Sequence, residues 1–231
     1  QRQMCIRDRS EDEQKLYYAC VQAAVADLGD EQGKLQILAA LTRLRQVCCD
    51  PGLCFENYEG PTSKLDACVE LCEAMAENGH QILLFSQFTS MLDRLRERLD
   101  ALHISNFTLQ GSTPKEKRAA MVKAFNAGSA SVFLISLKAG GMGLNLTAAD
   151  IVIHYDPWWN QAAQDQATDR AHRIGQQAHV QVYKLIAKDT IEERILELQN
   201  RKLALLDTIS GCEEAGILNM SSEELLSLLK S

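Results

Sequence analysis

Three side chains that could bind an anion lie close together near residue 170. Gln166, Arg170 and Arg173 are separated by four and three positions, so on a helix they share one face. A pair of guanidinium groups there can grip a polyphosphate in bidentate fashion. The alternative is an ordinary salt-bridged helix face, with Asp165 and Asp169 as partners. The spacing alone leaves both interpretations open.

The composition is that of a packed globular protein. The chain has 231 residues, 46% of them hydrophobic, and a formal net charge of −7. That charge argues against a basic nucleic-acid footprint over the whole sequence but allows a local one. The basic clusters at 93–99 and 115–118 are interpreted as solvated helix faces. No apolar run reaches the ~18 residues of a membrane helix, and the charged start lacks a signal region, so we expect a soluble cytoplasmic protein without a membrane partner.

The eight cysteines do not predict a metal site. They form no Cys-x-x-Cys pair, and no histidine pair accompanies them at ligand spacing. Cys68 and Cys72 fall on the apolar face of a predicted helix, so we expect them to be small buried side chains.

Short apolar runs alternate with helical patterns from residue 80 onward. This alternation predicts an α/β fold with a parallel sheet and helices on both faces, preceded and followed by helical segments. The predicted strands are 81–85, 106–109, 131–136, 151–154 and 180–186. The predicted helices are 11–28, 34–47, 63–79, 90–102, about 114–126, about 160–172, 190–209 and 221–229. We expect Thr113 and Thr190 to cap their helices, with Glu116 and Glu193 reaching back to the caps.

In a parallel sheet, ligands bind beyond the carboxyl ends of the strands. The loops that follow the predicted strands are 86–89, 110–113, 137–145 and 155–160. The first carries Ser86 and Gln87, and the second carries Gly111 and Ser112. Their hydroxyls and amides beside helix starts suit a phosphate, although ordinary capping explains the same residues without a ligand.

The loop after 131–136 is rich in glycine. Gly140, Gly141 and Gly143 allow positive φ and a close approach of the backbone to a ligand. A dinucleotide fingerprint would need a further glycine where Leu146 stands, so a dinucleotide-dependent enzyme is disfavoured. In the next loop, Trp158 and Trp159 are expected to place at least one ring in the core.

Two features of a complete nucleotide hydrolase are absent from the sequence. There is no phosphate loop of the form G-x-x-x-x-G-K-[ST], and no acidic pair ends an apolar strand where it could hold magnesium. The sequence therefore has arginines that could bind phosphate but lacks a phosphate-binding loop. This combination fits one half of a site that is shared between two lobes.

Several ordered segments carry a family resemblance. They read ILLFSQFTSMLDRL, LQGSTPKEKRAAMVKAFN, VFLISLKAGGMGLNLTAADIVIHYDPWWNQAAQDQATDRAHRIGQ and VYKLIAKDTIEERILELQNRK, and LTRLRQVCCDPGLCFENY precedes them. Over about 34–210 the chain closely resembles the C-terminal helicase lobe of Swi/Snf-family DNA-translocating ATPases of helicase superfamily 2, in their bacterial branch.

The resemblance implies a second RecA-like lobe that completes an ATP site with its own N-terminal lobe. That missing lobe would hold most of the ATP and Mg²⁺. Arg173 would be the finger facing the γ-phosphate, and Arg170 would either assist it or tie the motif to the lobe interface. The other nucleotide-binding residues implied are Gln166, Gly141, Gly143 and Asn145. The DNA-binding residues implied are Ser86, Gln87, Gly111, Ser112, Lys138 and Trp159.

The implied partners are double-stranded DNA, the N-terminal lobe and DNA-bound protein complexes, at the nucleoid in the cytoplasm. The resemblance also divides the chain. The divisions are a non-native leader at 1–9, a helical lead-in at 10–79, the RecA-like lobe at 80–189, and a brace helix with tail at 190–231.

The sequence departs from the family pattern at Gln110, where aspartate is common, and after Asn160, where proline is common. The alternative function is a free-standing, non-catalytic module that binds nucleic acid or regulates another motor.

Overall fold

The computed structural model groups the chain into two compact units. One unit contains residues 1–5 and 65–186, and the other contains residues 6–64 and 187–231. The helices at the two ends of the sequence therefore belong to one unit, and the helix Ser63–Glu77 belongs with the sheet from Leu65 onward. The residues that the structure describes are 2–28, 33–140, 144–160, 164–165, 168, 180–206 and 220–229.

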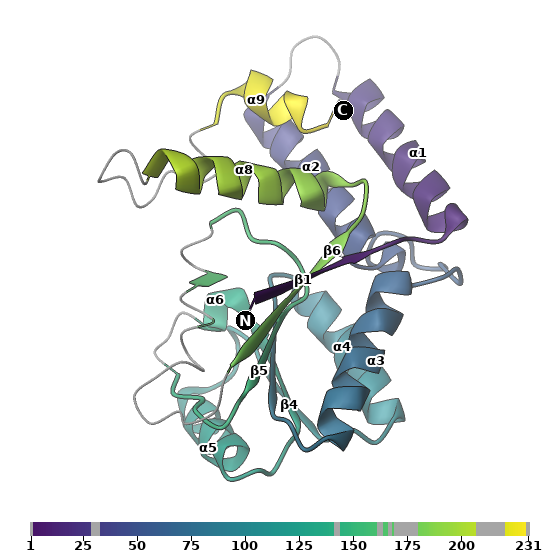
Figure 1. Ribbon diagram of the computed structural model, residues 1–231. Helices are drawn as coiled ribbons and strands as arrows, with labels where there is room; N and C mark the ends of the chain where they lie inside the picture. The colour runs from purple at the N-terminus through teal and green to yellow at the C-terminus, as the bar shows by residue number, and fades with distance from the viewer. Residues whose placement is uncertain are drawn as a thin grey trace. The chain divides into compact units, whose positions relative to one another are not determined.

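The first unit is built on a six-stranded sheet of order β1-β6-β5-β2-β4-β3 (Figure 1). The strands are β1 (Arg2–Arg7), β2 (Ile82–Ser86), β3 (Asn106–Leu109), β4 (Val132–Ser136), β5 (Ile151–His154) and β6 (Gln181–Ala187). Strands β2 to β6 pair in parallel. The five strands predicted from the apolar runs are confirmed to within one residue at each end. Every side chain of β2, β4 and β5 is buried, which is why these strands show no polar alternation.

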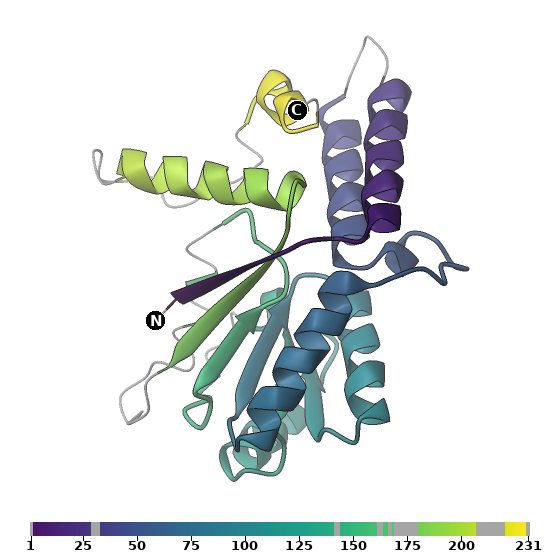
Figure 2. The ribbon, with the colours of Figure 1, turned by 45° about the vertical axis from the view of Figure 1, so that its right-hand side comes forward.

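Helices cover both faces of this sheet. They are α3 (Ser63–Glu77), α4 (Thr89–Ala101), α5 (Lys115–Asn126) and the short α6 (Leu137–Gly140). Figure 2 shows α3 and α4 beside each other on one face. On the other face, Phe125 of α5 packs against Phe133 with ring centroids 5.2 Å apart. Cys68 and Cys72 of α3 are fully buried, as predicted.

The second unit contains helices from both ends of the chain. They are α1 (Glu11–Asp27), α2 (Lys34–Cys49), the 3-10 turn η1 (Pro51–Leu53), α8 (Ile191–Leu206) and α9 (Ser222–Ser227). Helices α1 and α2 lie side by side, and α2 also contacts α8 and α9.

Buried charges join distant segments of this unit. Lys64 Nζ lies 2.6 and 2.7 Å from the two carboxylate oxygens of Glu192, and both side chains are buried. The Glu13 carboxylate accepts hydrogen bonds from Ser10 and Ser63. Because each carboxylate has donors around it, its burial does not leave it uncompensated.

The caps agree with the sequence only in part. Thr113 does not cap α5, because its hydroxyl accepts a hydrogen bond from the Gln110 amide, and Pro114 precedes the helix without a side-chain cap. Thr190 does cap α8, through a bond from the Glu192 amide, but Glu193 accepts from Asp189 rather than from Thr190.

The segment expected to be a leader forms secondary structure. Residues 2–7 form β1, which lies next to β6 at the edge of the sheet. The short, partly polar run gave no strand signal in the sequence. The origin of residues 1–9 stays a prediction.

Candidate functional site

Four loops meet at one edge of the sheet. Strands β2, β3, β4 and β5 end at Ser86, Leu109, Ser136 and His154. These ends are in register, since Ser86 pairs with Ser136 and Phe85 with His154. Because the strands are parallel, the loops that follow them lie along the same edge. The structure therefore brings together loops that the sequence could only suggest as neighbours.

A buried carboxylate ties two of these loops to each other. Ser86 Oγ donates to Asp156 Oδ1 at 2.6 Å, and Gln87 Nε2 donates to Asp156 Oδ2 at 2.5 Å. The Gln87 amide lies 3.3 Å from Asp156 Oδ1, and Ser86 Oγ accepts from the Phe88 amide at 3.1 Å. Asp156 is 1% exposed, so its charge is balanced inside the protein rather than offered to solvent.

This network corrects one predicted role. Ser86 is fully buried, so its hydroxyl presents no surface to DNA, and the DNA contact predicted for that side chain is wrong. Gln87 is half-buried. Asp156 is not among the predicted site residues, although an acidic residue two positions after a fully buried strand is a signal that could have singled it out.

Loop 110–113 is held by hydrogen bonds from an arginine of α5. Arg118 Nε donates to the Thr113 carbonyl at 2.6 Å, and Nη2 donates to the Gly111 carbonyl at 2.7 Å. A turn is closed by the Thr113 amide and the Gln110 carbonyl at 3.0 Å. Gly111 and Ser112 are exposed at the tip of this loop. Arg118 was expected on a solvated helix face, whereas it is half-buried and bound to the backbone.

The glycine segment begins as a helix. Lys138 and Gly140 belong to α6, so Gly140 has helical backbone and not the positive φ that was considered for it. Gly141 and Gly143 lie outside the described residues, as does the side chain of Lys138. Leu146 is fully buried in the core, which explains why this position is not a glycine.

The exposed Asn145 sits in a loop that α5 holds in place. The Asn126 side chain donates to the Asn145 carbonyl at 2.9 Å and accepts from the Ala148 amide at 3.3 Å. The Asn145 side chain is exposed, and its loop lies at the C-terminal end of α5 rather than at the carboxyl edge, where α5 begins. Its nucleotide-binding role stays a prediction.

The predicted phosphate-binding arginines fall outside the described part of the chain. Gln166, Arg170 and Arg173 are among the residues that the structure does not describe. Between Gln166 and Arg170, Thr168 is helical, and its hydroxyl lies 2.9 Å from His154 Nε2 at the end of β5. The His154 ring stacks on Phe85 with centroids 5.6 Å apart. Thr168 is therefore held against the end of β5.

The two tryptophans are both half-buried. Trp158 packs against the core cluster, but neither tryptophan is fully buried, so the expectation of a tryptophan packed in the core holds only in part, for Trp158. Trp159 lies in the loop after β5, at the same sheet edge as Gly111.

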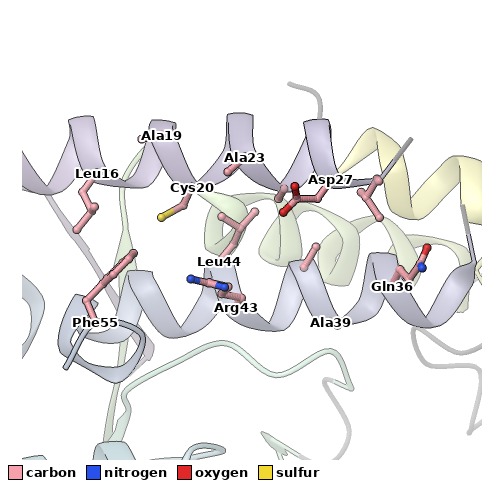
Figure 3. A pocket seen from close by; sticks show the side chains of 13 residues that line it. Leu16, Ala19, Cys20, Ala23, Asp27, Gln36, Ala39, Arg43, Leu44 and Phe55 are labelled. Carbon is pink, nitrogen blue, oxygen red and sulfur yellow. The ribbon is translucent and has the colours of Figure 1, made fainter. Parts of the chain in front are cut away.

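A separate cavity lies in the second unit. It has a volume of about 660 Å³ and runs between α1 and α2, where Leu16, Cys20, Arg43 and Phe55 face one another (Figure 3). Its walls are mostly apolar, and the Arg43 guanidinium lies 5.9 Å from the Phe55 ring centre. None of the predicted site residues lines this cavity.

Two negative findings concern the described residues alone. Within those ranges, no helix is long and apolar enough to cross a membrane. Within the same ranges, no three His, Cys, Asp or Glu side chains are grouped so that they could hold a metal ion.

Comparison with known proteins gives the family. Residues 63–175 match the helicase conserved C-terminal domain. An uncharacterized ATP-dependent helicase of Mycoplasma genitalium is 38% identical over 224 residues, which cover 96% of this chain and 22% of the relative. The chain thus spans about a fifth of that relative's length.

Two solved structures have the same fold over nearly the whole chain. The Sulfolobus solfataricus SWI2/SNF2 ATPase C-terminal domain is 28% identical with a TM-score of 0.78, covering 99% of this chain and 97% of that one. The core of the same ATPase in complex with double-stranded DNA is 29% identical with a TM-score of 0.79, covering 99% of this chain and 50% of that one. The parallel sheet with flanking helices is therefore a RecA-like fold, and the chain belongs to the Swi/Snf family, whose helicase conserved C-terminal domain it contains.

Proposed function

We propose that this chain is the C-terminal lobe of an ATP-driven translocase on double-stranded DNA. The observation that carries the proposal is the match to a SWI2/SNF2 ATPase C-terminal domain over 99% of this chain. The related ATPase core has been solved with double-stranded DNA, and it is twice as long as the part that this chain matches. The chain therefore corresponds to one half of such a core.

ATP is held mainly by the N-terminal lobe in this proposal. Arg173 reaches across the cleft to the γ-phosphate, and Arg170 assists it, because guanidinium groups bind phosphate oxygens in bidentate fashion. Gln166, Gly141, Gly143 and Asn145 line this lobe's side of the cleft. The support is their spacing and their position in the family segments.

Magnesium is not assigned to this chain. Among the described residues no three His, Cys, Asp or Glu side chains are grouped to hold a metal ion, and the Asp156 carboxylate at the carboxyl edge is engaged by Ser86 and Gln87. The N-terminal lobe would hold the ion together with the ATP phosphates.

The DNA backbone is followed by the loops at the carboxyl edge. Gly111 and Ser112 are exposed there, and Gln87, Lys138 and Trp159 belong to the neighbouring loops or to α6. Contacts of this kind go to phosphates, so they hold the strand without selecting a base sequence. ATP binding closes the two lobes on the strand, and hydrolysis releases them in turn. Proteins bound to DNA at the nucleoid would be displaced by this movement.

Substitution of the finger tests the proposal. In the protein that contains both lobes, Arg173→Ala should lower DNA-stimulated ATP hydrolysis by about 10³-fold or more while largely sparing ATP binding. Arg96→Ala, which removes an exposed arginine of α4, is the matched control and should leave turnover nearly unchanged. Phosphate release measures turnover, and a fluorescent ATP analogue measures binding.

The isolated chain gives the second arm of the test. It should bind duplex DNA weakly, with an affinity that falls steeply with salt, and it should not hydrolyse ATP. DNA-stimulated hydrolysis by the isolated chain would refute the two-lobe proposal. Equal loss of ATP binding and turnover in Arg173→Ala would reassign Arg173 to a structural role.

A further inference from the structure

The side chain of Arg118 turns back from the first turn of α5 onto loop 110–113. Its Nε and Nη2 atoms donate to the Thr113 and Gly111 carbonyls at 2.6 and 2.7 Å. A longer contact of 3.5 Å joins Nη2 to the Gln110 carbonyl. Carbonyl oxygens from three residues of one short loop thus converge on a single guanidinium group. This group carries its donors in a rigid plane, so it fixes the orientation of the peptides that it binds.

The orientation of one peptide follows from these contacts. The Gly111 carbonyl points toward Arg118, and the described peptide bonds are all trans. In a trans peptide the N–H and C=O groups point in opposite directions, so the Ser112 N–H is directed away from Arg118. No residue in the described part of the chain accepts a hydrogen bond from it. The exposed loop therefore presents the Ser112 amide and hydroxyl outward, with a positive charge behind them.

We propose that Arg118 is a positioning residue for DNA binding: it holds loop 110–113 so that the Ser112 amide and hydroxyl meet a backbone phosphate. The inference rests on the proposed function, in which this loop follows the DNA strand. Arg118 acts through the loop and contacts no phosphate itself. A second contact ties the same loop to α4, since Gln110 Nε2 donates a hydrogen bond to Asp93 Oδ1 at 3.3 Å.

The variant Arg118→Lys distinguishes two roles of Arg118, namely orienting the loop through its planar donors and supplying a positive charge. Lysine keeps the positive charge but lacks the planar fork that binds two carbonyls at once. If Arg118 positions the loop, Arg118→Lys and Arg118→Ala should each weaken duplex binding by about tenfold. The slope of log affinity against log salt should stay close to that of the wild type, because no phosphate contact is lost.

The measurement is fluorescence anisotropy of a short labelled duplex with the chain, over a series of KCl concentrations. Lys117→Ala is the matched control, because it removes an exposed charge from the same turn of α5 and leaves the loop contacts of Arg118 intact. It should change the affinity by less than about threefold. Circular dichroism verifies that each variant is folded.

Two outcomes would overturn the proposal. Wild-type affinity in Arg118→Lys, with a salt slope reduced by about 0.9 in Arg118→Ala, would make Arg118 a direct phosphate contact. Unchanged hydrogen exchange at the Thr113 amide in both variants would show that Arg118 does not order the loop, since that amide closes the turn onto Gln110. The exchange experiment needs no DNA. If the wild-type chain fails to bind duplex, the proposed function loses its DNA contact, while faster exchange would still support the ordering role of Arg118.

Discussion

The buried pair of Lys64 and Glu192 allows a quantitative prediction about stability. Lys64 Nζ lies 2.6 and 2.7 Å from the two carboxylate oxygens, and the side chains are 3% and 0% exposed. Lys64→Met leaves the Glu192 carboxylate buried without this cation, while the Ala187 amide still donates to it at 2.8 Å. Loss of one partner of a buried pair costs about 3–5 kcal/mol. With a urea dependence of about 2 kcal/mol per molar, the unfolding midpoint should fall by about 1.5–2.5 M.

Urea unfolding monitored by far-ultraviolet circular dichroism measures this shift. Lys15→Met is the matched control, because Lys15 also faces a carboxylate, that of Glu11 at 3.7 Å, but both side chains are exposed. It should cost less than about 0.5 kcal/mol. A double variant, Lys64→Met with Glu192→Leu, should be more stable than Lys64→Met, since it removes the buried charge that no longer has its Lys64 partner.

The result that would refute this reasoning is equal destabilisation by Lys64→Met and Lys15→Met. Tryptophan fluorescence adds a test of location. Both tryptophans, Trp158 and Trp159, lie in the unit with the sheet. Lys64, in the first turn of α3 just before the boundary at Leu65, and Glu192 belong to the other unit. If Lys64→Met shifted the unfolding midpoint more in tryptophan fluorescence than in circular dichroism, the destabilisation would lie in the sheet unit, contrary to this prediction.

Two further predictions concern the DNA loop and alkaline stability. A Cβ at Gly111 would meet no protein atom within 4 Å, so Gly111→Ala should preserve the stability of the fold. It should weaken duplex binding by about tenfold, measured by fluorescence anisotropy, because the added methyl group stands where DNA approaches the backbone. Unchanged binding would mean that DNA does not approach this backbone. Burial raises the pKa of the Cys48 thiol to about 12. The pKa of this thiol is higher in the folded than in the unfolded protein. Its contribution to the free energy of unfolding is therefore complete below about pH 8.5 and is lost as the pH rises toward 12, by up to about 1.4 kcal/mol per pH unit. Cys48→Ala should flatten this alkaline slope in urea titrations, and an identical slope would contradict the assignment.

The local elements were predictable because their signals are local. Apolar runs such as 82–86 and 132–136 are strands buried on both faces, and their alternation with helical patterns requires a parallel sheet. The parallel arrangement in turn places the loops after β2, β3, β4 and β5 at one edge. The sequence therefore located the candidate site, and it supplied the family segments that the comparisons confirm.

The partners of individual polar side chains were not predictable. Ser86 was expected to face DNA, but its hydroxyl turns inward to Asp156, 70 positions along the chain. Thr113 was expected to cap α5, but it bonds Gln110 within the loop while Arg118 binds the carbonyls around it. Each hydroxyl has several local partners of similar strength, and the packing around it selects one of them.

The sequence by itself determined the order of the strands and helices, the parallel sheet, and the edge that carries the loops. Only the tertiary structure decided that the segments before and after the sheet unit in the sequence form one helical unit. It also decided that Lys64 pairs with Glu192, 128 positions along the chain. Secondary structure follows from periodicity among near neighbours, so a reader of the chain can find it. A buried ion pair depends on which distant segments exclude water together, and this is fixed only when the whole unit packs.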